Sequence, residues 1–459
     1  MLLFRSSTIR SLAAGVLLLT GGVSALRADM ISDWNEYALT AARNSDQLSP
    51  EVARSMAMLN TAIYNAVEGI SGNYNLYTQG SYAGPSGTAV SGAYMEAAVS
   101  AAAYTVLADL YGSMSGTFST LYSNQLTALP DDQARLDGIN FGTLVAQDIL
   151  NWRAADGASD ANNAGIYNPV GSAGYWAPTS VNDAVIPGWG SVNTFAISGT
   201  TAFNGTLGMS NPDYMATGAY AADYNAVKTL GSSANPGNVR TTEQTEAALF
   251  WEGATGTTTN VGLWNQVAAG IVSSQSLSLE QSARLYAALN VTLADASIVL
   301  MDTKYETDFW SPVTAIANGG ADGNAATAPD GAWTPLLNSP DMPSYFAEQA
   351  ILAAAAKGIL DDYVNPATYT FTLGSDTNGD GLADFTFNFN SLNEAADQAT
   401  DSVVYGGTNF QKAADDGAAA GALIADAVMG SQFAAVPEPA GALLLVIAGM
   451  VSLGRRRRR

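Results

Sequence analysis

The chain has 459 residues and a formal net charge of −23, with 41 Asp and Glu residues against 18 Lys and Arg residues. It contains no His and no Cys, which excludes a Ser–His–Asp triad, a cysteine nucleophile, a disulfide and a zinc site of imidazole or thiolate ligands. A chain this acidic should repel nucleic acid, so we expect no nucleic-acid partner. Carboxylate chemistry, hard-cation binding or a role without catalysis remain open.

The first 28 residues have the order of a secretory signal. Arg5 and Arg10 give a positively charged start, residues 12–23 form a short apolar run, and small residues follow, with cleavage expected after Ala25 or Ala28. The sequence therefore predicts a signal peptide over residues 1–28 and export across the inner membrane.

Residues 436–459 form a second targeting segment. Pro437-Glu438-Pro439 precedes an apolar stretch over residues 440–453, and the chain ends in five arginines. An apolar run followed by arginines is typical of a membrane segment whose charged end stays in the cytoplasm. This end resembles the PEP-CTERM sorting signal of Gram-negative bacteria that make exopolysaccharide. The resemblance implies transient anchoring, recognition by the PEP-CTERM sorting machinery and delivery to the cell surface or matrix, where exopolysaccharide and other matrix components are candidate partners.

Between these ends, apolar residues recur at helical spacing. Ser49-Pro50-Glu51 is a typical helix start, and Val52, Met56, Leu59 and Ile63 follow on one face. The same reasoning predicts helices over about 49–66, 88–110 and 130–152, helical signals that return at 242 and continue through 260–272, and helices over 278–301, 344–363 and 417–429.

Two segments depart from this helical pattern. Residues 154–240 are rich in Gly, Asn, Ser and Pro without clear periodicity, which predicts long surface loops. Residues 369–373 and 385–389 alternate aromatic or aliphatic residues with polar ones, which predicts a two-stranded β-ribbon. No internal repeat of fixed period is evident.

The loop of this ribbon carries oxygen-bearing side chains at alternate positions. Asp376, Asn378, Asp380 and Asp384 occupy positions 1, 3, 5 and 9 of an EF-hand-type loop, with Gly381 at position 6. The twelfth position, which normally supplies a bidentate Glu, is Phe in this chain. Two interpretations stay open: a structural Ca²⁺ site, or an Asx-rich turn that binds nothing.

Several segments of the body resemble vanadium-dependent haloperoxidases, whose helical fold is shared with type 2 phosphatidic-acid phosphatases. The similar segments are residues 53–58, 62–67, 240–245, 250–251, 293–296, 304–305 and 308–316. The resemblance implies an all-α fold over residues 29–435, made of two helical bundles (about 29–239 and 240–435) with long surface loops and one small β-ribbon.

The resemblance also implies where an oxyanion site should lie. The family holds vanadate or phosphate with a Lys, two Arg, a Ser, a Gly N–H and a metal-bonded His, and a further His acts as acid and base. In this chain the corresponding positions are Lys304, Ser311, Ala347, Glu348, Gln349, Val403 and Asn409. Only the lysine is retained, so we expect neither vanadate binding nor haloperoxidase or phosphatase catalysis, and no cofactor other than a structural Ca²⁺.

Three functions are compatible with these residues. The first is a catalytically inactive relative that serves as a binding or extracellular-matrix protein. The second is a hydrolase-like enzyme with a rebuilt site of carboxylates, for which Glu306, Asp308 and Glu348 are candidates. The third is an active haloperoxidase or acid phosphatase, in which Arg54 or Arg240 would have to replace the lost cations. Lys304, close in sequence to several acids, is otherwise expected to form a structural ion pair with one of them.

Overall fold

The structure is a computed structural model that describes residues 25–77, 92–163, 167–178, 184–205, 207–431 and 433. Most of the expected signal peptide (1–28) and all of the expected sorting segment (436–459) lie outside the described residues.

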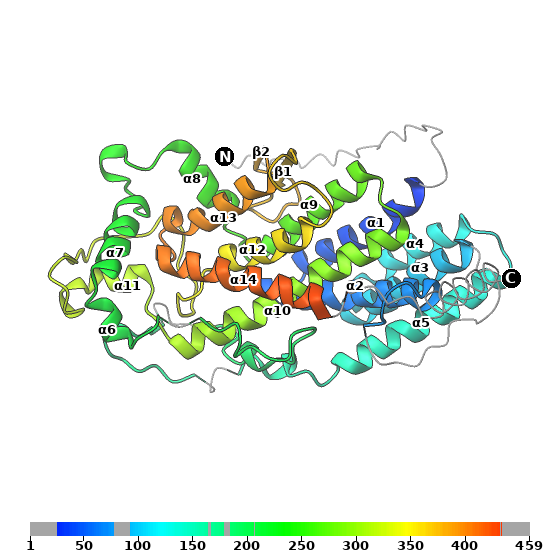
Figure 1. Cartoon of the computed structure of the whole chain (residues 1–459), viewed down its shortest axis with the longest axis horizontal. Coiled ribbons are helices and arrows are strands. Elements are labelled where there is room, and N and C mark those ends of the chain that lie inside the picture. Colours follow the sequence, from blue (N-terminus) through cyan, green and yellow to red (C-terminus); the bar gives the residue numbers. More distant parts are fainter. Residues whose placement is uncertain are drawn as a thin grey trace, which may run out of the picture.

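The described chain is mainly helical, as the sequence predicts (Figure 1). The helices are α1 (Ala25–Arg43), α2 (Ser49–Ser71), α3 (Gly92–Leu110), α4 (Ser115–Thr127), α5 (Gln133–Arg153), α6 (Asn211–Met215), α7 (Gly218–Leu230), α8 (Thr242–Phe250), α9 (Thr259–Gln275), α10 (Leu279–Thr307), α11 (Pro312–Ala317), α12 (Glu348–Leu360), α13 (Leu392–Gly406) and α14 (Gln411–Ser431). Short 3₁₀ helices are η1 (Gly112–Met114), η2 (Ala158–Asp160), η4 (Trp189–Ser191), η5 (Pro236–Asn238) and η6 (Gly319–Ala321).

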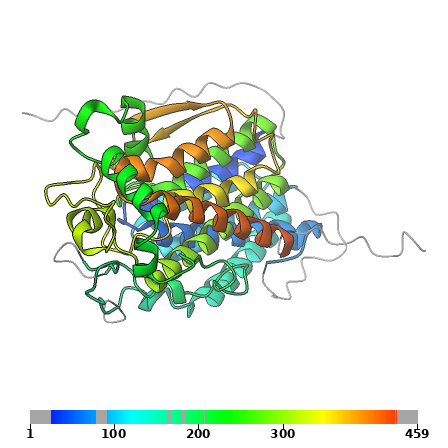
Figure 2. The ribbon, with the colours of Figure 1, turned by 60° about the vertical axis from the view of Figure 1, so that its left-hand side comes forward.

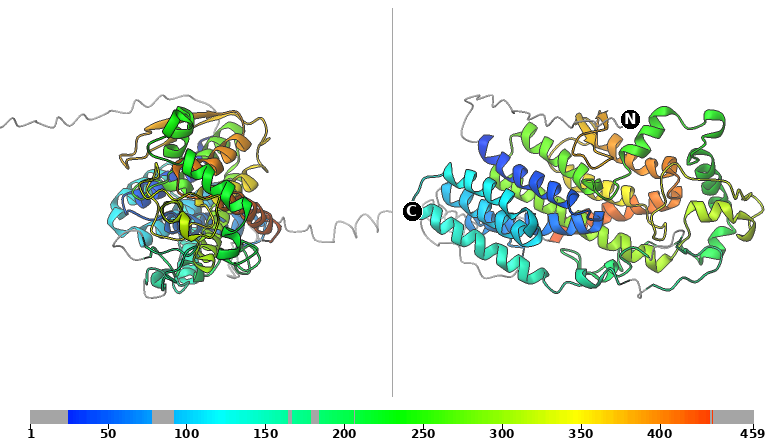
Figure 3. Two further views of the ribbon diagram at one scale, coloured as in Figure 1. Left: turned by 90° about the vertical axis from the view of Figure 1, so that its left-hand side faces the viewer. Right: turned by 180° about the vertical axis from the view of Figure 1, so that it is seen from behind.

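Helix α10 is the central element of the fold. It packs against α2 from the first half and against α12 and α14 from the second, so both halves share one hydrophobic core. Its length and apolar composition would suit a membrane span, but 94% of its most apolar window is buried inside the protein. Helices α3, α4 and α5 lie at one end of the elongated molecule, and α6, α7 and α11 lie at the other (Figures 1 and 3).

Local sequence signals explain where the central helices begin. The Ser278 hydroxyl accepts a hydrogen bond from the Gln281 backbone N–H, and the Gln281 side chain accepts one from the Ser278 N–H, which is a capping box. At the start of α2, the Glu51 carboxylate likewise accepts the Leu48 N–H at 2.8 Å. These contacts satisfy N–H groups that have no partner within the helix.

The predicted β-ribbon is confirmed. Strands β1 (Phe371–Ser375) and β2 (Phe385–Phe389) pair antiparallel, with Phe371 opposite Phe389 and Leu373 opposite Phe387. The ribbon packs beside α8, α9 and α13, and in the turned view it lies on the outside of the helices (Figure 2). Its loop is thereby held next to the N-terminal part of α9.

The structure reveals an internal duplication that the search for a repeat of fixed period missed. Helices α1 and α2 correspond to α9 and α10, with each residue matched by the one 230 positions later. The identical pairs in this register are Trp34 and Trp264, Asn35 and Asn265, Ala38 and Ala268, Ala53 and Ala283, Arg54 and Arg284, Ala57 and Ala287, Leu59 and Leu289, Asn60 and Asn290, and Ala66 and Ala296.

The duplicated helices are joined by the same buried contact in each half. The amides of Asn35 and Asn60 bond to each other at 3.1 and 2.7 Å, and those of Asn265 and Asn290 do so at 2.8 and 2.9 Å. In each pair, both side chains also donate to the carbonyl four residues earlier. Buried amides satisfied in this way fix the register of one helix against the other.

Some predicted boundaries and one predicted loop region are wrong. Helix α7 lies inside residues 154–240, where only loops were expected. Thr217 caps this helix, which buries Tyr220, Tyr224 and Val227 at spacings of four and three, so an aromatic stripe replaces the usual aliphatic one. Helix α12 begins at Glu348 rather than near Ser344, because residues 345 and 346 form a bend and Ala347 is extended.

Candidate functional site

Four of the seven positions expected to form an oxyanion site come together in one cavity of about 180 Å³. Lys304 from the last turn of α10, Glu348 and Gln349 from the first turn of α12, and Asn409 from the segment before α14 all line it. The N-terminal end of α2 and the segment after α8 complete the wall. The remaining three positions, Ser311, Ala347 and Val403, are buried but do not line this cavity.

Lys304 is buried, with 4% of its surface exposed, and its Nζ donates to the Pro343 carbonyl at 2.9 Å. Burial lowers the pKa of this ammonium to about 8, although Glu348 acts in the opposite direction. The expectation that a nearby acid in sequence pairs with Lys304 is wrong, because its charged neighbour is Glu348 on another helix.

Glu348 is the first residue of α12, so its carboxylate lies at the positive end of the helix dipole. Burial raises its pKa, while Ser49, Lys304 and Asn260 lower it. An internal carboxyl group therefore stands beside Lys304 and the helix N-terminus, the two features that would otherwise attract an oxyanion.

A second carboxylate, Glu252, lines the same cavity and was missed by the sequence reasoning. Burial raises its pKa as well. The sequence signal that could have identified Glu252 is its position directly after Phe250-Trp251, which resembles the haloperoxidase pattern. The cavity thus sets one ammonium against two carboxyl groups, a donor set suited to a small neutral or cationic group.

Gln349 and Asn409, at the expected histidine positions, bind backbone carbonyls. Gln349 Nε2 donates to the Trp251 oxygen at 3.2 Å, and Asn409 Nδ2 donates to the Ser344 oxygen. Neither amide can exchange a proton near neutral pH, so their role here is to hold the wall of the cavity together.

The two arginines considered as substitutes for the lost cations point elsewhere. Arg54 Nε bonds to Asp156 at 2.7 Å, beside a different pocket. Arg240 is buried and donates to the backbone oxygens of Leu230 and Ser232. Neither lines the cavity that contains Lys304.

The proposed cluster of Glu306, Asp308 and Glu348 does not form. Glu306 accepts a hydrogen bond from Asn204 and lines a separate pocket, and Asp308 accepts one from Tyr167 at 2.8 Å. Asp308 caps the C-terminal end of α10 in the left-handed region, and it does not line the cavity. Because Asp308 is buried, its pKa is raised to about 6, although its hydrogen bonds with Tyr167 and the Trp176 N–H act in the opposite direction.

The Asp-rich ribbon loop is ordered by its own hydrogen bonds. Asp376 accepts the N–H groups of Gly379 and Gly381, and Asp384 accepts the N–H and hydroxyl of Thr377. Asn378 and Asp380 accept backbone N–H groups two residues on. Among the described residues no group of three or more acidic side chains is arranged to hold a metal ion. The Ca²⁺ site remains a prediction, and the Asx-turn interpretation accounts for these contacts.

The cavity does not fit vanadate or phosphate. Such an oxyanion needs several cations and N–H donors at close range, and the lining offers Lys304 alone against Glu252 and Glu348. Since the chain contains no His, it lacks both imidazoles that the resemblance implies, the metal-bonded one and the one that acts as acid and base.

The lowered pKa of Lys304 has a measurable consequence for stability. An ammonium with a native pKa of about 8 and an unfolded pKa near 10.5 destabilises the fold while protonated in both states. The wild-type free energy of unfolding should therefore rise, relative to Lys304→Met, by about 1.4 kcal/mol per pH unit above pH 8. Urea denaturation of both proteins at pH 7.5 and 9.5 measures this difference. If the difference in the free energy of unfolding between the two proteins were equal at both pH values, the pKa of Lys304 would not be lowered by folding.

Comparison with known proteins agrees with this architecture. Residues 284–436 match the family described as the VCPO second helical-bundle domain. A bacterial vanadium-dependent iodoperoxidase structure superposes with a TM-score of 0.71 at 20% identity, covering 91% of this chain and 98% of that one. Holo-type and apo-type structures of a bacterial vanadium-dependent chloroperoxidase give TM-scores of 0.64 and 0.66, at 15% and 16% identity. They cover 85% and 83% of this chain, and 95% and 92% of their own lengths. No curated protein matches the sequence. The chain therefore has the vanadium haloperoxidase fold, which confirms the predicted fold class.

Proposed function

We propose that this chain is an exported protein on the haloperoxidase fold that has lost oxyanion binding and catalysis and acts as a binding or extracellular-matrix protein. The observation that carries the proposal is the cavity in which Lys304 faces Glu348, with Glu252 on the same wall. The internal carboxylate takes the place that an oxyanion would need.

Electrostatic magnitudes support the loss of binding. Each missing arginine removes roughly 4 kcal/mol of Coulomb attraction for a charge ~4 Å away at an effective dielectric near 20. In its ionised form Glu348 adds repulsion of the same order, in either form its side chain fills the place beside Lys304, and the net charge of −23 opposes any approaching anion. The single positive charge of Lys304 cannot offset the lost attraction and the added repulsion.

The ends of the sequence support a place of action outside the cytoplasm. The signal-like start and the Pro437-Glu438-Pro439 tail with its arginines fit export, transient anchoring by the PEP-CTERM sorting machinery and release to the surface or matrix. Exopolysaccharide and other matrix components are the proposed partners in that compartment.

The proposal predicts that purified protein shows no vanadate-dependent bromination and no vanadate binding. Bromination of a phenol-red type acceptor and isothermal titration with orthovanadate measure the two properties, with an active bacterial iodoperoxidase as the positive control. Phosphatase activity should also stay at the level of a buffer blank. Turnover that requires vanadate and is suppressed by phosphate would contradict the proposal.

A further inference from the structure

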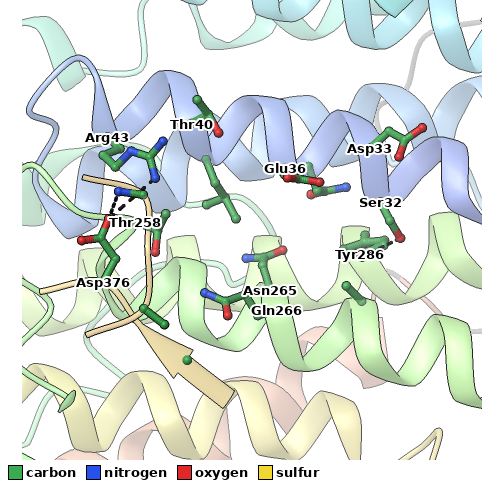
Figure 4. A pocket seen from close by; sticks show the side chains of 16 residues that line it. Ser32, Asp33, Glu36, Thr40, Arg43, Thr258, Asn265, Gln266, Tyr286 and Asp376 are labelled. Atoms are coloured by element: carbon green, nitrogen blue, oxygen red, sulfur yellow. Dashed lines mark hydrogen bonds and ion pairs between the residues drawn. The ribbon is translucent and has the colours of Figure 1, made fainter. Parts of the chain in front are cut away.

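A larger groove, about 490 Å³, lies between α1 and α9 and is closed at one end by the ribbon loop (Figure 4). This size falls within the ~300–1,000 Å³ range of small-ligand sites. The groove shares no lining residue with the cavity around Lys304. Of its lining residues, Asp376 and Gly381 belong to the Asp-rich ribbon loop, and the rest of the groove belongs to none of the motifs described above.

The floor of the groove is buried and already ordered. Asn35, Asn265 and Tyr286 are at most 3% exposed, and the Tyr286 hydroxyl lies 3.0 Å from the Ser32 hydroxyl. Because the asparagines belong to the duplicated amide pairs, the floor is fixed by contacts on both sides of the groove. A preformed floor lowers the entropic cost of binding.

The walls present polar groups that are still available. Glu36 on α1 and Gln266 on α9 occupy equivalent positions of the duplication and face the groove. Their side chains, and the hydroxyls of Thr40 and Thr258, have no hydrogen-bond partner among the described residues. One carboxylate, one amide and two hydroxyls therefore converge on one space, beside the apolar surfaces of Leu39 and Ala269.

The charges of the groove indicate the kind of ligand. Asp376 is held by Arg43, 3.7 Å away, and by loop N–H groups, so its charge is largely compensated. Asp33, the third lining carboxylate, also has an interaction partner, so Glu36 is the one lining carboxylate without a partner among the described residues, which is too little for a polycation. An anion would be repelled by the strongly acidic chain. Amides, hydroxyls and a single carboxylate suit the paired donors and acceptors of vicinal hydroxyl groups.

We propose that the groove between α1 and α9 binds a neutral polyhydroxylated ligand, a short segment of an oligosaccharide. The inference rests on the proposed function in that it assigns the binding role to a specific site. It does not depend on the state of the cavity around Lys304.

Saturation-transfer NMR of the purified protein with neutral trisaccharides of glucose, mannose and galactose tests the proposal. Spermidine and trigalacturonate serve as cationic and anionic comparators. At least one neutral trisaccharide should bind, and both Glu36→Ala and Gln266→Ala should weaken it about three- to tenfold, as expected for one lost hydrogen bond. Glu36→Gln, which keeps a hydrogen-bonding group, should lose less. Gln275→Ala changes an exposed residue of α9 that lies outside the groove, and it should leave binding unchanged.

Three results would overturn the inference: no neutral trisaccharide binds, the Glu36 and Gln266 variants bind like wild type, or spermidine binds in preference to every sugar. Circular dichroism of each variant separates loss of binding from loss of fold. Absence of sugar binding leaves the vanadate experiments unaffected, and vanadate turnover leaves the groove result unaffected. The two proposals can therefore fail separately.

Discussion

Restoring the residues that the haloperoxidase resemblance implies should give this chain the ability to bind orthovanadate. The reconstruction comprises Ser311→Arg, Ala347→Ser, Glu348→Gly, Gln349→His, Val403→Arg and Asn409→His. We expect the affinity to rise at least about 100-fold over wild type, because two guanidinium groups are gained and one carboxylate is removed, each with roughly 4 kcal/mol of Coulomb energy at ~4 Å. Isothermal titration with vanadate measures the gain.

The matched control is the same reconstruction with Lys304→Met. If Lys304 is the retained part of the old site, its removal should lower the vanadate affinity of the reconstruction at least about tenfold, because one cation at ~4 Å is lost. Ser311 and Val403 are buried, so folding is checked by circular dichroism and melting. A smaller variant with only Glu348→Gly, Gln349→His and Asn409→His changes the lining alone. Folded variants that all fail to bind vanadate would show that the correspondence of positions is wrong.

The sequence predicted the helical fold class and part of the cavity lining, whereas helices α1, α4, α7 and α13 were not expected. Capped amphipathic segments such as α2 and α10 were predictable, because their start signals and apolar stripes are local. The resemblance placed Lys304, Glu348, Gln349 and Asn409, which the structure brings together from three separate parts of the chain. No periodicity could have shown this, since the contacts join segments far apart in sequence.

Other features could not be predicted by the signals that were used. Glu252 enters the cavity only because the segment after α8 packs beside the start of α12, a tertiary contact. The duplicated helices occur twice, 230 positions apart, so they give no short fixed period in the sequence. Their trace in the sequence is the Trp-Asn pair, which occurs at Trp34-Asn35 and again at Trp264-Asn265. The groove between α1 and α9 could not be predicted either, because its walls come from two helices far apart in sequence.

Asp156 is expected to be the most sensitive position for stability. Its Oδ2 accepts hydrogen bonds from Arg54 Nε at 2.7 Å and from Arg153 Nε at 2.8 Å, and its Oδ1 accepts the Ala158 N–H. Arg153 is 1% exposed, and its remaining N–H groups donate to the Asn193 and Thr194 carbonyls. The carboxylate thus ties α2 and α5 to the long loop that precedes α6.

Asp156→Asn should lower the free energy of unfolding by about 3–5 kcal/mol, because Arg153 would keep a buried charge without its partner. Burial alone would raise the pKa of Asp156, but Arg54 and Arg153 outweigh it and hold that pKa below its ordinary value. The carboxylate therefore stabilises the fold above the unfolded pKa near ~3.9, and this contribution is lost as the pH falls through the native pKa. The difference between wild type and variant in urea denaturation should be full at pH 7 and should shrink below about pH 4.

Asp131→Asn is the matched control, because it removes a carboxylate from an exposed ion pair with Arg135. Such a pair contributes less than about 1 kcal/mol, so the control should denature nearly like wild type. If Asp156→Asn cost no more than Asp131→Asn, the buried contacts of Arg153 with the loop carbonyls would be sufficient to solvate its charge. The stability of this region would then depend on the packing of the guanidinium over the Phe195 ring, 3.8 Å from its centre, and not on the ion pair.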